Sequence, residues 1–160
     1  MKPSKYFKMK RSVFKLISIL SITLLAMELK AQDIQSKQWE NRILIVKSND
    51  EKSEDFQQQI KLFNTNKKGL IDRKLVLFKI INDKYHFIDY AHSNLTKSGI
   101  ISDEFKSKYF PNQSEFKVLL LGLDGGIKLQ QTKVLSIDKL FNTIDAMPMR
   151  RSEIRRQSDN

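Results

Sequence analysis

The sequence predicts an α/β domain in which a mixed β-sheet is flanked by helices. Three observations predict it. Two short apolar runs of the kind that form buried strands enclose one amphipathic stretch, a second pair of strands is joined by a glycine-rich turn, and another amphipathic stretch follows that pair.

The first half of the domain is expected to form a strand, a helix and a second strand. Residues 43–46 are an apolar run rich in β-branched side chains, as in a central strand buried on both faces. The helix should begin within residues 48–55, which supply several capping side chains and place carboxylates in the first turn, and should stop at Gly69. Residues 75–81 repeat the buried-strand pattern. Two strands joined in this way lie parallel in a right-handed unit.

The middle of the chain carries weaker signals. Residues 82–84 are typical of a turn, and residues 85–90 alternate well enough to form a short extra strand. The polar stretch 90–101 is expected to be loop. A helix should begin at residues 102–104 and end before Pro111.

The last third predicts a hairpin and a final helix. Residues 116–121 and 127–129 flank Gly-Leu-Asp-Gly-Gly, whose glycines tolerate the positive φ of a tight turn. Ser136 should cap the final helix and Pro148 should mark its end. The resulting order, β-α-β-α-β-β-α, is that of a thioredoxin-like fold with a mixed sheet between layers of helices.

The amino terminus predicts export. A basic head, an apolar run of about 12 residues and the small residue Ala31 are typical of a cleaved secretory signal over residues 1–31. The alternative, an uncleaved anchor, is disfavoured because a spanning helix needs about 20 residues. We expect a thioredoxin-like domain over residues 32–149, a polar arginine-rich tail over residues 150–160, and a periplasmic or secreted protein that does not span the membrane after cleavage.

Charge and composition exclude several functions. The formal charge is +11, but the leader holds seven basic residues and one acidic residue, so the 129 residues after it carry 22 basic and 17 acidic side chains, a net +5. This lower charge argues against nucleic acid as a partner. The chain has no cysteine, which excludes thiol-disulfide exchange, thiol peroxidase activity and lipid attachment at a cysteine. No cofactor is predicted.

The carboxyl-terminal half resembles a known family. Residues 116–129, residues 140–153 with the string Ile-Asp-Ala-Met-Pro-Met-Arg, and residues 38–45 are similar to the family called domain of unknown function 4174. Its members resemble peroxiredoxin-like and thioredoxin-like domains of exported bacterial proteins, and recur in vertebrate matrix proteins that contain sushi repeats. The resemblance implies the fold and an exported location, and it assigns no reaction.

The residues after the first strand are one candidate site. Thioredoxin-like enzymes place their reactive group there, and Ser48 and Asn49 occupy the position here. Ser48 could bind an anionic ligand or serve an enzyme with non-cysteine chemistry. The alternative is that both residues cap the following helix.

Histidines are poor evidence for a metal site. His86 and His92 would share one face of a strand while Asp89 between them points to the other, and the chain has no further histidine to complete a set of ligands. No metal site is predicted.

The arginine-rich tail is the second candidate. If it is helical, Arg151 and Arg155 share a face at i, i+4, and Arg150 and Arg156 extend the patch. Such a patch would suit an anionic glycan, a lipid headgroup or a carboxylate. The alternative is a solvated tail in which Arg150 folds back to pair with Asp145 or Asp124.

Arg42 with Trp39 is a further candidate contact point, but Trp39 is expected instead to pack at the edge of the core. The leading hypothesis is therefore an exported, non-catalytic thioredoxin-like module that binds an unknown protein or an anionic envelope component. The alternative is an enzyme on the same scaffold with its site near Ser48.

Overall fold

The computed structural model describes residues 37, 39–92, 96–112 and 114–159. The predicted signal, residues 1–31, lies outside this part of the chain. The elements in chain order are β1 (Arg42–Ser48), α3 (Glu54–Thr65), α4 (Lys67–Asp72), β2 (Leu75–Ile81), β3 (Lys84–Asp89), β4 (Thr96–Ile100), α5 (Asp103–Tyr109), β5 (Phe116–Leu121), β6 (Ile127–Gln131), α6 (Ile137–Asp145) and α7 (Pro148–Ser158).

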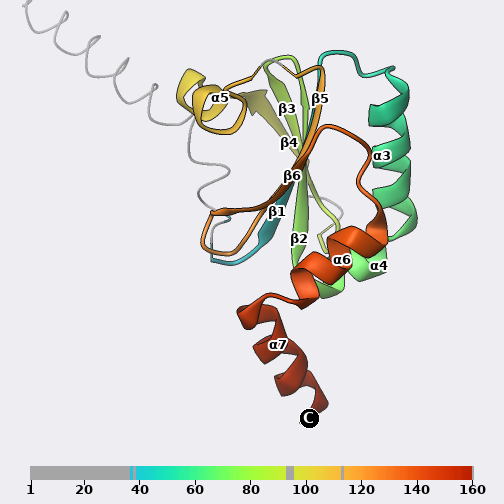
Figure 1. Ribbon diagram of the computed structural model, residues 1–160, viewed down its shortest axis with the longest axis vertical. Helices are drawn as coiled ribbons and strands as arrows, with labels where there is room; N and C mark the ends of the chain where they lie inside the picture. The colour runs from blue at the N-terminus through green and yellow to red at the C-terminus, as the bar shows by residue number, and fades with distance from the viewer. Residues whose placement is uncertain (1–36, 38, 93–95, 113, 160) are drawn as a thin grey trace, which may run out of the picture.

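The strands form one mixed sheet in the order β4-β3-β2-β1-β5-β6 (Figure 1). β1 and β2 are parallel, whereas β1 pairs with β5 in the antiparallel sense. A β-α-β unit (β1, α3, α4, β2) is thus joined to a β-β-α unit (β5, β6, α6), which is the layout of the thioredoxin-like fold. The prediction of this fold is confirmed.

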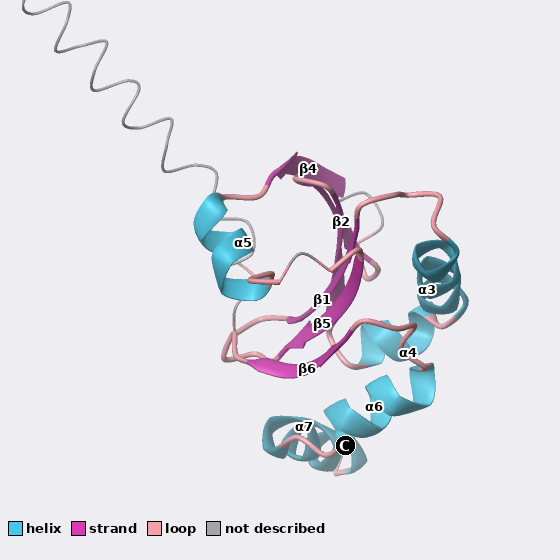
Figure 2. Cartoon of the chain, turned by 45° about the horizontal axis from the view of Figure 1, so that its top comes forward, coloured by secondary structure: helices cyan, strands magenta, loops and turns pink. Residues whose placement is uncertain are grey.

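Helices cover both faces of the sheet (Figure 2). Helices α3, α4 and α6 lie on one face, over a core that includes Leu44, Leu77 and Leu120. Helix α5 lies on the other face, over a core that includes Ile45, Phe78 and Leu119. The central strands are apolar on both faces because both faces are covered.

Strand β4 was not predicted. Residues 96–100, Thr-Lys-Ser-Gly-Ile, carry no apolar alternation, and four of the five are exposed. They form a strand because they pair with β3, and the ring of Tyr85 lies against the backbone of Gly99. The expectation of loop over residues 90–101 was therefore wrong for these five.

The first helix begins within the predicted capping segment, with Glu54 and Asp55 in its first turn, but it ends earlier than predicted. Its N-cap is Ser53, five residues after the predicted capping residue Ser48, which instead ends β1. Gly69 does not stop a helix but lies inside α4. A Cβ built there would lie 2.6 Å from Cζ of Phe141, so a glycine lets α4 approach α6 closely.

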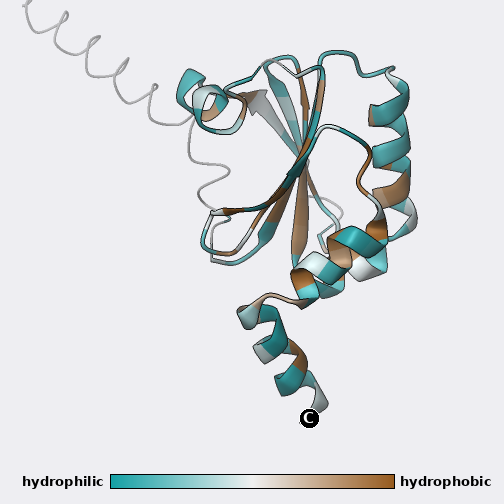
Figure 3. Cartoon of the chain, viewed as in Figure 1, coloured by the Kyte–Doolittle hydropathy of each residue, from teal (hydrophilic) through white to brown (hydrophobic). Residues whose placement is uncertain are grey.

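The predicted tail is helical. Pro148 follows α6 and occupies the first turn of α7, where its missing N–H leaves no helical hydrogen bond unmade. Helix α7 is strongly hydrophilic along most of its length (Figure 3). No helix among the described residues is long and apolar enough to cross a membrane.

Candidate functional site

Ser48 lies where thioredoxin-like enzymes carry their reactive group, at the carboxyl end of β1. Its side chain is buried, and the residue is 2% exposed. Its Oγ accepts a hydrogen bond from the N–H of Asp50 at 3.1 Å, donates one to the carbonyl of Asp50 at 2.8 Å and lies 3.1 Å from Oγ of Ser53. The hydroxyl therefore holds the β1–α3 loop in shape.

Asn49 is exposed and belongs to the same loop end. Its N–H donates to the carbonyl of Glu115 at 3.0 Å, and its side-chain oxygen accepts a bond from Nζ of Lys47 at 2.6 Å. Lys47 also donates to the carbonyl of Ser114 at 2.7 Å. Burial lowers the pKa of Lys47, against the opposing effect of the Asp83 carboxylate. This lysine ties β1 to the segment before β5. Neither Ser48 nor Asn49 caps α3, because the N-cap of that helix is Ser53.

The histidines lie apart from this loop. Asp89 ends β3, and the chain then turns, so that its buried carboxylate accepts bonds from the N–H of Ala91 and from the ring of His92. Asp89 and His92 therefore meet, whereas an extended strand would separate them. Burial raises the pKa of Asp89, but these hydrogen bonds outweigh it and leave the pKa below its ordinary value. Within the described ranges, no three potential ligand side chains gather into a metal site.

Arginines and acids from four parts of the chain meet at the amino-terminal end of β1. We call this set, which lies between α7 and the rest of the domain, the anchor cluster. Its members are Arg42, Asp72, Arg73, Asp145, Arg150 and Glu153.

Arg42 and Arg150 are the buried cations of the anchor cluster, at 1% and 3% exposure. Nη1 of Arg42 donates to Glu153 at 3.1 Å and to the carbonyl of Arg73 at 3.0 Å. Arg150 donates to the carbonyl of Asp72 at 2.9 Å, to the carboxylate of Asp72, and through Nε to Asp145 at 3.4 Å. The pairing of Arg150 with Asp145 is the alternative that the sequence analysis left open.

Arg73 completes the anchor cluster. It holds the Asp145 carboxylate with two hydrogen bonds, at 3.0 and 2.6 Å, and its guanidinium lies 4.0 Å from the centre of the Phe141 ring. Burial raises the pKa of Asp145, but the hydrogen bonds and charge of Arg73, then those of Arg150, lower it further than burial raises it. The anchor cluster thus joins α4 and α6 as well as α7.

The remaining predicted tail residues face outward. Arg151, Arg155 and Arg156 are exposed, and the first two share one side of α7 at i, i+4. Arg150 and Glu153, at i, i+3, form the opposite, docked side. The structure therefore separates the four tail arginines into one anchor and three solvent-facing cations, and it places Arg42 with the anchor.

Trp39 does not pack at the edge of the core. It is 66% exposed, just before β1, and its N–H donates to the carbonyl of Leu123 at 2.8 Å. Its φ of 71° is unusual for a large side chain. The prediction that it packs was wrong because this turn directs the indole outward.

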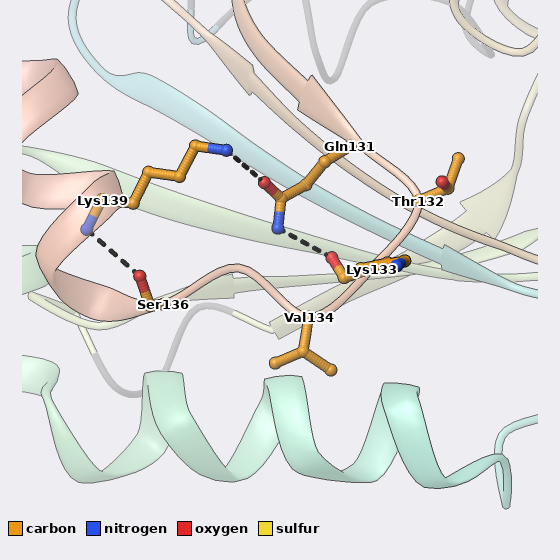
Figure 4. Close-up of a pocket in the computed structure, with 6 residues that line it drawn as sticks. All are labelled: Gln131, Thr132, Lys133, Val134, Ser136 and Lys139. Carbon is orange, nitrogen blue, oxygen red and sulfur yellow. Dashed lines mark hydrogen bonds between the residues drawn. The ribbon is translucent and has the colours of Figure 1, made fainter.

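A shallow depression of about 450 Å³ lies where β6 ends and α6 begins (Figure 4). Nζ of Lys139 donates to the side-chain oxygen of Gln131 at 2.8 Å, and the amide of Gln131 donates to the carbonyl of Lys133 at 2.9 Å. Thr132, Val134 and Ser136 complete the lining. No pattern in the local sequence predicts this depression.

A buried glutamine fixes the loop between β6 and α6. Gln59 of α3, which is 0% exposed, donates to the carbonyl of Leu135 at 3.1 Å and accepts from its N–H at 2.6 Å. The partners lie 76 residues apart in the chain. The signal that could have found Gln59 is its place among Phe56 and Phe63 on the apolar side of the helix, where a polar side chain needs a partner.

Comparisons with known proteins identify the family of the chain. No curated protein matches the chain at a significant level. The crystal structure of Plasmodium vivax 2-Cys peroxiredoxin in its reduced form is similar, with a TM-score of 0.49 and 14% identity, over 75% of this chain and 83% of that chain. The family model named Domain of unknown function (DUF4174) matches residues 33–153, from before β1 to the Glu153 of the anchor cluster. The chain belongs to the DUF4174 family.

Proposed function

We propose that this protein is an exported, non-catalytic thioredoxin-like module that binds a protein or an anionic envelope component through the outer side of α7. The observation that carries the proposal is the division of the tail arginines. Arg150 is buried and fixes the helix, while Arg151, Arg155 and Arg156 remain exposed on it. A helix fixed in this way presents guanidinium groups with little loss of freedom on binding.

The way in which α7 is attached to the domain supports this role. The helix has no apolar side that could pack on the domain, so charged side chains hold it in place. Arg150 is the only member of α7 that is buried, and its partners are charged or carbonyl oxygens. Charged side chains at such a density are ordinarily just solvated. Here the helix that carries them is fixed to the domain through Arg150 and Glu153, so their Cα positions are set relative to one another, which favours recognition of carboxylate, phosphate or sulfate groups.

The Ser48 loop supports a binding role over the alternative enzyme. The Ser48 hydroxyl is turned into its own loop, where it both donates and accepts hydrogen bonds. A nucleophile or ligand-binding hydroxyl must instead be within reach of the substrate. The absence of cysteine already excludes thiol redox chemistry at this position.

Vesicle and envelope binding test the proposal. The triple variant Arg151→Gln, Arg155→Gln, Arg156→Gln should bind anionic phosphatidylglycerol vesicles or the envelope fraction at least about tenfold more weakly, since each basic side chain near an anionic surface contributes about 1 kcal/mol. The matched control is Lys61→Gln, Lys67→Gln, Lys68→Gln, which removes the same charge from exposed sites on α3 and α4.

Equal losses in the two triple variants would mean that only the net charge matters, and the proposed site would be wrong. Export is tested separately by sequencing the amino terminus of the protein recovered outside the cytoplasm. A chain that begins near Gln32 is the expected result, and a chain retained in the cytoplasm would contradict the proposal.

A further inference from the structure

Strand β6 is an outer strand of the sheet, and its free edge leads into the depression at its carboxyl end. We propose that this edge is a second binding surface, where an extended peptide segment with acidic side chains adds a seventh strand beside β6 and places a carboxylate at the depression. This surface is distinct from the α7 arginines, so it goes beyond the function proposed above.

The edge of β6 has unused hydrogen-bonding capacity. Its neighbour in the sheet is β5, and residues 129–131 follow regular antiparallel register opposite Val118, Leu119 and Leu120. Successive residues of such a strand alternately turn their backbone groups toward the partner and away from it. In the described part of the chain, no other backbone group bonds to residues 127–131. Strand addition is the established way in which extended peptides use such an edge.

Charge indicates which peptide fits. Lys133 and Lys139 are exposed beside the depression, and neither forms an ion pair with a described residue. Lys128 on the strand is already paired with Asp124 at 2.7 Å, and Asp138 is the one acid next to Lys139 in the chain. The carboxyl end of β6 is therefore cationic, and it favours an acidic segment.

Lys139 is already placed to receive a carboxylate. Its side chain extends from α6 across to Gln131, where Nζ donates to a neutral amide oxygen at 2.8 Å (Figure 4). A carboxylate is a stronger acceptor than an amide, so exchange of partners favours the ligand. The buried Gln59 bonds keep the backbone of Leu135 fixed beneath this site. The Lys139 side chain and the backbone of this loop are thus preorganised for the ligand.

Lys133 and Lys139 have another explanation, and so does the shift of register between β5 and β6 at Leu120 and Leu121. Both features also discourage edge-to-edge aggregation, and a second copy of this chain is the alternative occupant of an open edge. These explanations predict no binding of a monomeric acidic peptide, so experiment separates them from the proposal.

The probe is a short synthetic peptide of alternating glutamate and threonine, acetylated and amidated so that only side chains are charged. Its binding to the folded protein is measured by calorimetry, and its site by hydrogen exchange. We expect binding that slows exchange at the amides of residues 127–131 and leaves those of β4 unchanged. The same peptide N-methylated at alternate residues should lose binding, because methylation removes the donors along one edge without changing charge.

Two variants test the residues. The double variant Lys133→Gln, Lys139→Gln should weaken binding about tenfold, whereas the control Lys61→Gln, Lys68→Gln should bind normally. All four lysines are exposed, so both variants should retain the circular dichroism spectrum of the folded protein. The α7 triple variant should also bind the peptide normally, so that failure of this inference is distinguishable from failure of the proposed function.

Any of three results would overturn the inference. Equal binding of the N-methylated peptide would exclude strand addition. Equal binding of a peptide with lysine in place of glutamate would exclude the acidic assignment. If protection from exchange at residues 127–131 increases with protein concentration in the absence of peptide, a second copy of the chain is the occupant.

Discussion

At the scale of single residues, the position of a side chain in a familiar fold does not define its task. Ser48 stands where related folds place a reactive group, yet its hydroxyl closes a turn between Asp50 and Ser53. The capping role predicted for it was also wrong, because the helix begins later, after Ser53. What remains is a buried hydroxyl that organises a loop.

Ser48→Ala should lower the free energy of unfolding by about 1 kcal/mol, since it leaves the N–H of Asp50 without its acceptor. Urea denaturation measures this loss. Binding to the envelope fraction should be unchanged. Ser107→Ala on the exposed side of α5 serves as the control and should cost less than about 0.5 kcal/mol. Loss of binding or of any turnover in folded Ser48→Ala protein would favour the enzyme alternative.

At the scale of elements, α7 shows how charges alone can dock a helix. Buried ion pairs are costly to form, but they are costly to break as well, because the remaining charge stays buried without a partner. Glu153 is the acid that faces the deepest cation, Arg42, and it also lies 3.6 Å from Nη1 of Arg150. Helix α7 therefore depends on Glu153.

Glu153→Gln should destabilise the protein by about 3 kcal/mol and release α7. Hydrogen exchange at residues 148–158 should become much faster than in the native protein, while exchange in β1 changes only through global unfolding. Glu104→Gln in the exposed first turn of α5 is the matched control, since it removes the same charge elsewhere. If α7 exchanges as slowly in Glu153→Gln as in the native protein, the ion pairs do not hold it.

At the scale of the whole molecule, most of the element order and the parallel pairing of β1 with β2 were predictable, whereas the pairing of β4 with β3 was not. The buried strands and amphipathic helices are visible in local sequence, and they suffice for the thioredoxin-like layout. Strand β4 was missed because its side chains are mostly exposed and its only cause is pairing with β3. The partners of Arg150 were only partly foreseen, since Asp72 lies 78 residues away. Local periodicity carries no information about such contacts.

The free energy of unfolding should fall at acidic pH, because buried or paired carboxylates become protonated. The pKa of Asp145 is lowered, although burial opposes this, because the hydrogen bonds and charge of Arg73 favour the ionised form. A lowered folded-state pKa stabilises the protein above the ordinary value of 3.8, and this contribution is lost as the pH falls toward the folded-state pKa.

Urea denaturation at several pH values below neutrality checks this expectation. In Asp145→Asn, the free energy of unfolding should fall less between neutral and acidic pH than in the native protein. The difference should be no more than about 1 kcal/mol, since the carboxyl is 34% exposed and partly screened. An identical pH profile in Asp145→Asn would show that other carboxyls, such as Asp89, cause the decline.

The anchor cluster has a consequence for how this sequence can change. Three arginines and three acids share partners at the join between α7 and the domain, so a single replacement there leaves a buried charge with fewer partners. Arg42 and Glu153 should therefore be lost or exchanged together among related sequences, as should Arg150 and Asp72. Substitutions at these positions are expected to be coupled, whereas the exposed arginines of α7 lie outside the anchor cluster and should vary one at a time without disturbing the fold.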